Sequence, residues 1–309
     1  MKEEAKNGSV HTTVLLNETI EGLNLDRNNK KGGVIVDATF GGGGHSKNIL
    51  EKYPEVRIIA LDQDKGAFNK AKDKFKNTKK RITFVNINFR DIDEAVKKEG
   101  EDKVDGIIFD LGLSRDQLEN SGRGFSFMKD EPLLMTMKEN PRPEDLTALE
   151  IVNDWGEKSL ADIIYGYGEE RFSRKIASAI VEARKKKKIQ TTMDLAKIIE
   201  SSVPSSYKRG KINPATKTFQ ALRITVNDEL GALEAGIRKG FNILKKGGRM
   251  SVISFHSLED RIVKKFFREK EKEGEVRLIN KKPIIPKEEE LNENRRSRSA
   301  KLRILEKLI

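Results

Sequence analysis

The stretch VIVDATFGGGGHS, from Val34 to Ser46, joins a short apolar run ending in Asp37 to four consecutive glycines. An apolar run of this length, closed by a turn, is typical of a strand buried inside a parallel sheet. Glycines directly after such a strand let the backbone approach a ligand closely and adopt positive φ angles. The stretch therefore predicts a ligand-binding turn at the carboxyl end of a buried strand.

Apolar runs alternate with amphipathic helical patterns from this stretch to Asp110. The runs that predict buried parallel strands are Val34–Asp37, Arg57–Leu61, Ile82–Val85 and Gly106–Phe109. The next such run, Arg249–Phe255, follows much later, although a crossover between parallel strands needs only about a dozen residues. The alternation predicts an α/β fold with a doubly wound sheet, and the long interval predicts an insertion.

The interval between the fourth and fifth predicted strands divides into a crossover helix and an insertion. Apolar residues recur at steps of four and three from Leu222 to Leu244, which predicts one continuous helix. The remainder, from Ser114 to Lys217, is rich in helical patterns. Two pairs have the spacing of a capping box: Ser159 with Asp162, and Thr191 with Asp194. We expect a sheet domain at residues 10–113 and 218–309, and an all-helical inserted domain at residues 114–217.

The C-terminal part of the chain predicts one more helix and two more strands. HSLEDRIVKKFFREK has a helical pattern, and EVRLIN and AKLRILE predict a closing pair of strands. The tract between them, residues 281–299, contains proline and many charges. We expect a loop there, and its disorder is an open alternative.

The composition limits the class of protein. The chain has 309 residues, 36% of them charged, and a formal net charge of +12 at pH 7. A basic excess either solubilises the surface or attracts a polyanion such as nucleic acid. The absence of cysteine excludes disulfides, iron–sulfur clusters and a cysteine nucleophile. Because no apolar segment approaches the roughly 18 residues of a membrane span, and no signal peptide is recognisable, we expect a soluble, cytoplasmic protein.

The glycine run fits neither of the common phosphate-binding motifs. The dinucleotide fingerprint G-x-G-x-x-G fails, because counting from Gly41 places Ser46 at its last position. A P-loop needs Gly-Lys followed by Ser or Thr, which is missing. A glycine turn without a phosphate cradle favours S-adenosylmethionine, although a serine variant of the dinucleotide fingerprint stays open.

Acidic residues follow the predicted strands at their carboxyl ends, where ligands of open α/β sheets bind. Asp62 and Asp110 stand there, as Asp37 does. The Asp62 carboxylate can accept hydrogen bonds from both ribose hydroxyls, or it can cap a helix. Phe89 can cover an adenine face or pack in the core. Acidic residues at successive strand ends around a glycine turn predict a site for an adenosine-containing cofactor.

Longer motifs carry a resemblance to a known family. They are HTTVLLNETIEGL, DATFGGGGHS, DGIIFDLGLS, RGFSFM, GEERFSRKIA, NPATKTFQALRITVNDEL, GGRMSVISFHSLEDRIVK and RSRSAKLRI. With them the chain resembles the bacterial 16S rRNA cytosine-N4 methyltransferase family, known as RsmH or MraW. The resemblance implies a class I methyltransferase sheet with a helical insertion for substrate recognition, and S-adenosylmethionine as cofactor. It also implies methylation of N4 of a P-site cytidine, C1402 in the family, in 16S rRNA or the assembled small ribosomal subunit.

The resemblance also carries site residues onto this sequence. It implies a cofactor-binding set of Gly43, Gly44, His45, Asp62, Phe89, Asp110 and Gln117, and no metal. The glycines and His45 would line the methionine side of the cofactor, while Asp62 would hold the ribose. Arg115 and Asp116 stand where the family usually has Ser-Pro, so the turn before Gln117 is expected to differ.

The expected chemistry is proton removal from a weak nucleophile. The cytosine N4 amine has its lone pair delocalised into the ring, so we expect its proton to leave during or after methyl transfer. Asp110 can accept that proton, or it can bind the ammonium group of the cofactor instead. Methylation at C5 usually needs a cysteine adduct, which this chain cannot form.

Basic and aromatic residues suggest where RNA binds. The basic runs are Arg184–Lys188, Lys208–Lys211 and Arg295–Arg303, and each of them can instead be a solvated surface. Phe125, Phe127 and Trp155 can stack on bases or pack in the core. His256, near Asp260, can contact RNA or be structural, and no ligand spacing links it with His11 and His45.

Other functions stay open at this point. They are methylation of another RNA site by the same fold, a non-catalytic RNA-binding role in ribosome assembly, and NAD-dependent oxidoreduction, which the failed fingerprint disfavours. The sequence is compatible with a monomer and with a homodimer.

Overall fold

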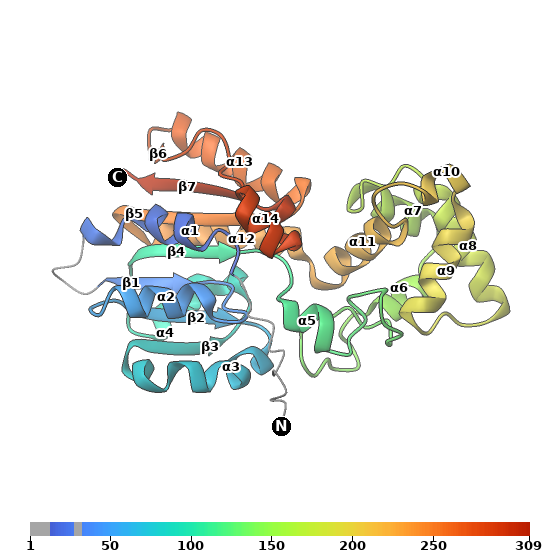
Figure 1. Ribbon diagram of the computed structural model, residues 1–309, viewed down its shortest axis with the longest axis horizontal. Helices are drawn as coiled ribbons and strands as arrows, with labels where there is room; N and C mark the ends of the chain where they lie inside the picture. The colour runs from blue at the N-terminus through green and yellow to red at the C-terminus, as the bar shows by residue number, and fades with distance from the viewer. Residues whose placement is uncertain (1–12, 28–32) are drawn as a thin grey trace, which may run out of the picture. The chain divides into compact units, whose positions relative to one another are not determined.

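The computed structural model describes residues 13–27 and 33–309 (Figure 1). The described residues form two compact units. The first comprises the chain up to Asp62, Gly66–Gly112 and Glu234–Ile309, and the second comprises Gln63–Lys65 and Leu113–Leu233. The second unit therefore includes residues 218–233, which the sequence pattern assigns to the sheet domain. His11 lies outside the described residues.

A single sheet frames the described part of the first unit, with the strand order β3-β2-β1-β4-β5-β7-β6. Its strands are β1 (Val34–Asp37), β2 (Arg57–Asp62), β3 (Ile82–Asn86), β4 (Val104–Asp110), β5 (Leu244–Ser254), β6 (Val276–Leu278) and β7 (Lys301–Lys307). Strands β1 to β5 run parallel, whereas β7 is antiparallel to β5 and β6. The predicted strands and the α/β class are confirmed. All four residues of β1 are buried between β2 and β4.

Helices cover both faces of the sheet (Figure 1). They are α1 (Leu16–Leu23), α2 (Gly44–Lys52), α3 (Lys65–Ala71), α4 (Ile92–Lys98), α12 (Glu229–Ile243) and α13 (Ser257–Lys272), with 3₁₀ turns at Leu25–Arg27, Lys72–Arg81 and Phe89–Asp91. Side chains of β4 alternate between the two faces, as a strand requires. Ile108 packs in the cluster formed by α1 and α2, whereas Ile107 and Phe109 lie under Gly240 of α12.

The second unit is built from helices around its own apolar core. They are α5 (Arg115–Asn120), α6 (Ala148–Asp154), α7 (Glu157–Gly166), α8 (Ser173–Lys186), α9 (Thr192–Ser202), α10 (Ser205–Lys208) and α11 (Ala215–Asn227). Phe125 is buried in the core, and Phe127 and Trp155 pack against it. The packing role that the sequence left open for these rings is therefore the one they have.

The helix starts test the two predicted caps. The Thr191 side chain accepts a hydrogen bond from the Asp194 N–H at the start of α9, as predicted. The Ser159 prediction is wrong, because α7 begins at Glu157 and Ser159 lies inside the helix. The reason is that Gly156, which has extended backbone angles, is the N-cap of α7, so the helix starts soon after α6 ends.

The predicted continuous helix from Leu222 to Leu244 is wrong, because the chain breaks it into α11 and α12 at Asp228. Asp228 has a φ of 46°, in the left-handed region that aspartate and asparagine tolerate better than most residues. Asn227 holds the break, since its side chain accepts from the Met137 N–H and donates to the Met135 carbonyl, both at 2.8 Å. The apolar spacing continues across the break, so periodicity alone conceals it.

The tract at residues 281–299 is not a structureless loop. It contains α14 (Glu288–Glu293) and a 3₁₀ turn at Arg295–Ser299. Glu290 accepts a hydrogen bond from the Leu15 N–H at 2.8 Å, and Ser297 is fully buried. Contacts with the start of the chain therefore order a segment whose composition favours disorder. No helix among the described residues is long and apolar enough to cross a membrane.

Candidate active site

The glycine run forms a tight turn between β1 and α2. Gly41 and Gly43 have φ angles of 50° and 73°, which favour glycine. A Cβ at Gly43 would lie 2.6 Å from the Phe40 ring, and one at Gly44 would lie 1.8 Å from Thr13 Oγ1. The protein's own side chains therefore already exclude larger residues from this turn.

Asp62 closes the turn from the neighbouring strand. Its Oδ2 accepts a hydrogen bond from the Gly41 N–H at 2.8 Å, and its side chain is partly exposed. Gly41 thus has a role beyond the turn itself, since its N–H orients the carboxylate. Each carboxylate oxygen can accept more than one hydrogen bond, so this contact leaves room for ribose hydroxyls.

His45 and Asp110 meet at the ends of α2 and β4. The His45 Nε2 lies 3.5 Å from Asp110 Oδ2, and the His45 side chain is 5% exposed. Both ring nitrogens of His45 and Oδ1 of Asp110 are buried and have no hydrogen-bond partner among the residues that the structure describes. Thr39 Oγ1 accepts from the Asp110 N–H at 2.6 Å, which fixes the strand end. Because buried polar atoms are almost always hydrogen-bonded, this pair indicates a place for a polar ligand.

Asp37 lies below this pair and is 1% exposed. Its Oδ2 accepts from the Ser46 hydroxyl at 2.6 Å, which ties β1 to the first turn of α2. Burial raises the pKa of Asp37 above its ordinary value, and the negative charge of Asp110 raises it further, against the opposing effects of Ser46 and His45. Asp37 therefore acts as a support for the turn. Ser46, the residue that breaks the dinucleotide fingerprint, is its hydrogen-bond partner.

Phe89 begins the 3₁₀ turn after β3 and is half-buried. Its ring packs edge-on against Phe109, with centroids 5.6 Å apart, and a Cβ at Gly236 would lie 2.8 Å from it. The core contact that the sequence left open is therefore present on one side of the ring. A role beside adenine rests on the part of the ring that stays exposed.

Gln117 belongs to the second unit, whereas the other predicted site residues belong to the first. Its Oε1 accepts from the Ser114 N–H, and its Nε2 donates to Asp64 Oδ2 at 3.2 Å. Ser114 and Gln117 form a capping box for α5, which the spacing Ser-x-x-Gln signals but our sequence analysis did not use. Arg115 and Asp116 occupy the first two positions of that helix.

Arg123 bonds to residues beside the candidate site, and its role was not predicted from the sequence. Its guanidinium pairs with the buried Asp64 carboxylate at 2.5 Å and donates to the Met137 carbonyl at 2.8 Å. Arg123 opens the motif RGFSFM, which was the available signal. Asp64 is thus a buried partner of both Arg123 and Gln117.

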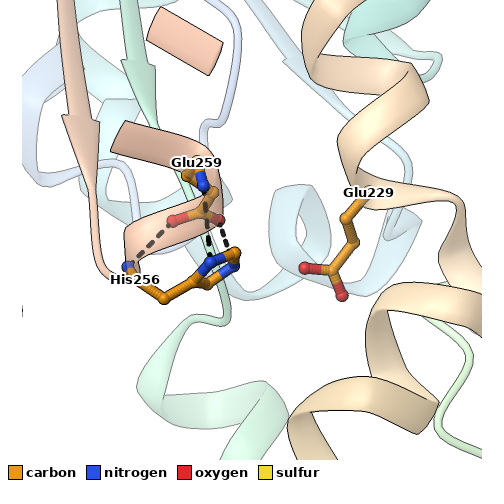
Figure 2. A group of neighbouring side chains, drawn as sticks. All are labelled: Glu229, His256 and Glu259. Atoms are coloured by element: carbon orange, nitrogen blue, oxygen red, sulfur yellow. Dashed lines mark hydrogen bonds and ion pairs between the residues drawn. The ribbon is translucent and has the colours of Figure 1, made fainter. Parts of the chain in front are cut away.

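His256 has a structural role. Figure 2 shows it beside Glu259 at the start of α13, where the two residues form a capping box. The His256 Nδ1 accepts from the Glu259 N–H, and Glu259 Oε2 accepts from the Phe255 N–H at 2.8 Å. Asp260 pairs with Arg303 at 2.7 Å rather than with this histidine.

The fold and this site together define the class. A sheet with this strand order, an antiparallel β7 beside β5, a glycine turn after β1 and acidic residues ending β1, β2 and β4 define a class I S-adenosylmethionine-dependent methyltransferase. The sequence profile of the MraW methylase family matches residues 8–308. The chain belongs to this family, as its motifs indicate.

Relatives of known name support this membership. A "Ribosomal RNA small subunit methyltransferase H" of Persephonella marina is 49% identical over 91% of this chain and 94% of its own length. The protein of the same name from Carboxydothermus hydrogenoformans is 48% identical over 96% of this chain and 98% of its own. The chain is also similar to solved structures. A putative methyltransferase from Streptococcus mutans, in complex with SAH, is 12% identical with a TM-score of 0.46, and the match covers 96% of this chain and 99% of that one.

Proposed function

We propose that this enzyme transfers a methyl group from S-adenosylmethionine to N4 of a cytidine in small-subunit rRNA, at the position corresponding to C1402. The relatives from P. marina and C. hydrogenoformans, whose names specify small-subunit rRNA, support the substrate class. The motifs shared with the family support the base and the atom. The observation that carries the proposal is the pair of His45 and Asp110, with buried polar atoms that have no hydrogen-bond partner within the described parts of the chain.

The residues of the glycine turn fit the cofactor. Gly43 and Gly44 would hold its methionine part through their backbone, with His45 beside them, and Asp62 would hold the ribose. Phe89 would lie near the adenine, and Gln117 would complete the pocket. When bound, S-adenosylmethionine supplies an electrophilic methyl group. The carboxylates of Asp62 and Asp110 suit a ligand that carries two hydroxyls, a sulfonium and an ammonium group.

Asp110 would accept the proton that the N4 amine loses. Its side chain is 24% exposed, so the carboxylate can pass the proton on to water. The His45 ring, 3.5 Å away, restricts where the carboxylate can turn, and the Thr39 hydroxyl holds the Asp110 backbone. The reaction also requires that the amine and the methyl group are aligned. A rigid site would hold the N4 nitrogen about 3–3.5 Å from the transferred carbon.

The test of this function is product analysis. The full chain is incubated with S-adenosylmethionine and either small ribosomal subunits that lack the modification or their naked 16S rRNA. Nucleosides are then separated and weighed by mass spectrometry. We expect N4-methylcytidine with at least one substrate form, and the better form identifies the natural substrate. Its absence from both forms contradicts the proposal, and methylation of another base redirects it to a different RNA site. A ribosomal substrate would place the activity in the cytoplasm.

A further inference from the structure

The turn between α7 and α8 carries an arginine stacked on two aromatic rings. The Arg171 guanidinium carbon lies 4.8 Å from the centroid of the Phe172 ring and 5.1 Å from that of Tyr207, on α10. The two rings contact each other edge-on, with centroids 4.9 Å apart. We call these three residues the Arg171 platform.

Glu170 holds the rings of the platform in place. Its side chain is fully buried, accepts from the Phe172 N–H at 2.8 Å and accepts from the Tyr207 hydroxyl. Burial and the hydrogen bond and charge of Glu170 raise the pKa of Tyr207 to about 12, although Arg171 opposes them. Tyr207 therefore stays protonated and keeps donating at neutral pH. A buried acid with two fixed donors makes the platform rigid.

The Arg171 side chain is exposed. Among the residues that the structure describes, no ion pair includes Arg171 or five exposed basic residues at the start of α8 and at or after the end of α10. These are Arg174 and Lys175 on α8, Lys208 at the end of α10, and Arg209 and Lys211 shortly after it. By contrast, Lys185 of the basic run on α8 is already paired with Glu182. Arg171 is thus one of several exposed cations in this part of the second unit.

We propose that the Arg171 platform binds a backbone phosphate of single-stranded RNA. This rests on the proposed function, which supplies an RNA substrate. A planar guanidinium can donate two hydrogen bonds to one phosphate, and stacking on rings orients it in advance. Two exposed tyrosines at the C-terminal end of α7, Tyr165 and Tyr167, offer faces on which unpaired bases stack. The platform would hold the RNA strand while the strand ends of the first unit act on the cytidine.

The experiment measures binding of a labelled single-stranded oligoribonucleotide of mixed sequence to the full chain, by fluorescence anisotropy at several salt concentrations. We expect Arg171→Ala to weaken binding about tenfold and to reduce the salt slope by about 0.7, as the loss of one phosphate contact requires. Arg171→Lys should restore the slope but only part of the affinity, because lysine lacks the planar fork. Tyr207→Phe should weaken binding too, since it frees the ring from Glu170.

Lys197→Ala is the matched control, because it removes one exposed cation from α9 of the same unit. We expect its affinity and slope to match wild type. The proposal is overturned if Arg171→Ala binds like wild type, or if Lys197→Ala loses as much. It is also overturned if polyglutamate, added at the same total charge as the RNA, displaces the RNA and its own binding is weakened equally by Arg171→Ala. S-adenosylmethionine binding and thermal unfolding of each variant verify that it folds.

This test does not depend on methyl transfer. If wild type forms no N4-methylcytidine yet Arg171→Ala weakens RNA binding, the proposed function fails and the platform stands. If wild type methylates its substrate but Arg171→Ala binds RNA normally, the function stands and the platform fails.

Discussion

The carboxylate of Asp110 and the ring of His45 lie together, and three of their buried polar atoms have no hydrogen-bond partner in residues 13–27 and 33–309. The Ser46 hydroxyl donates to the nearby Asp37 carboxylate, and the Thr39 hydroxyl accepts from the Asp110 N–H. At this scale the sequence was a good guide to which residues gather, because strand ends of a parallel sheet meet at one edge. It could not assign the hydrogen bonds, since Thr39 and Ser46 look like ordinary turn residues.

Asp110→Asn separates proton acceptance from cofactor binding. Asparagine keeps the shape and one acceptor oxygen, but it is far less basic than a carboxylate. We expect kcat to fall by about 100-fold or more, the usual contribution of a positioned acid or base, while cofactor affinity changes much less. Steady-state kinetics and calorimetry measure the two effects.

Asp102→Asn, which changes an exposed aspartate before the other end of β4, is the control and should leave both quantities unchanged. A loss of cofactor binding in Asp110→Asn that matches the loss of turnover would show that Asp110 holds the ammonium group instead.

Asp37→Asn tests the buried support through pH. Because the pKa of Asp37 is raised, the folded chain binds this proton more tightly than the unfolded chain does. The stability contributed by that proton is present at low pH and is lost as the pH rises through the raised pKa. We therefore expect the difference in unfolding free energy, variant minus wild type, to be more positive at about pH 7 than at about pH 4. Urea unfolding at both values measures this, and a pH-independent difference would refute it.

Among the elements, the turn from β1 to α2 and the break between α11 and α12 show two kinds of predictability. The turn follows from local sequence, because glycines after an apolar run have few other uses. The break at Asp228 depends on Asn227 bonding to Met135 and Met137, which are far away in the chain. Similarly, α14 is ordered by Leu15, nearly the whole chain away. Long-range partners of this kind leave no periodic signal.

Gly43→Ala and Gly100→Ala separate conformation from crowding. Both glycines have positive φ, 73° and 78°, but only Gly43 has neighbours that an added Cβ would meet. Gly100→Ala should cost about 1 kcal/mol of folding free energy, the cost of left-handed backbone alone. Gly43→Ala should cost about 2–4 kcal/mol, because overpacking against the Phe40 ring adds to it. Urea unfolding compares the two, and equal losses would mean that the Phe40 ring moves aside freely.

The whole molecule combines a sheet unit that carries the candidate cofactor site with a helical unit that carries several exposed basic residues, under a net charge of +12. The α/β class, the insertion and the cofactor were predictable, because each rests on composition, periodicity or long motifs. The ends of the second unit were not, since α11 continues the apolar spacing of α12 while packing with the insertion. Gln117 was expected in the cofactor pocket; its bond to Ser114 follows from the capping-box spacing, whereas its bond to Asp64 depends on the three-dimensional structure.

The net charge predicts different salt responses for the two ligands. Binding of 16S rRNA should weaken steeply and linearly on a logarithmic salt scale, because phosphate contacts release counterions. Binding of S-adenosylmethionine should change little, because the cofactor displaces no such counterions. Titrations of both ligands over one salt series test this. A flat response for the RNA would mean that the basic surface makes no phosphate contacts.

The three residues that follow Asp62 affect any attempt to delete the helical insertion from this enzyme. Gln63–Lys65 belong to the helical unit although they lie within the sheet segment of the sequence. Excising residues 114–217 would remove Arg123 and Gln117, both of which bond to the Asp64 carboxylate. The insertion therefore cannot be deleted without also disturbing the residues that follow β2. A shortened version would need a redesigned loop after β2, with a neutral residue at position 64, before its cofactor affinity could be interpreted.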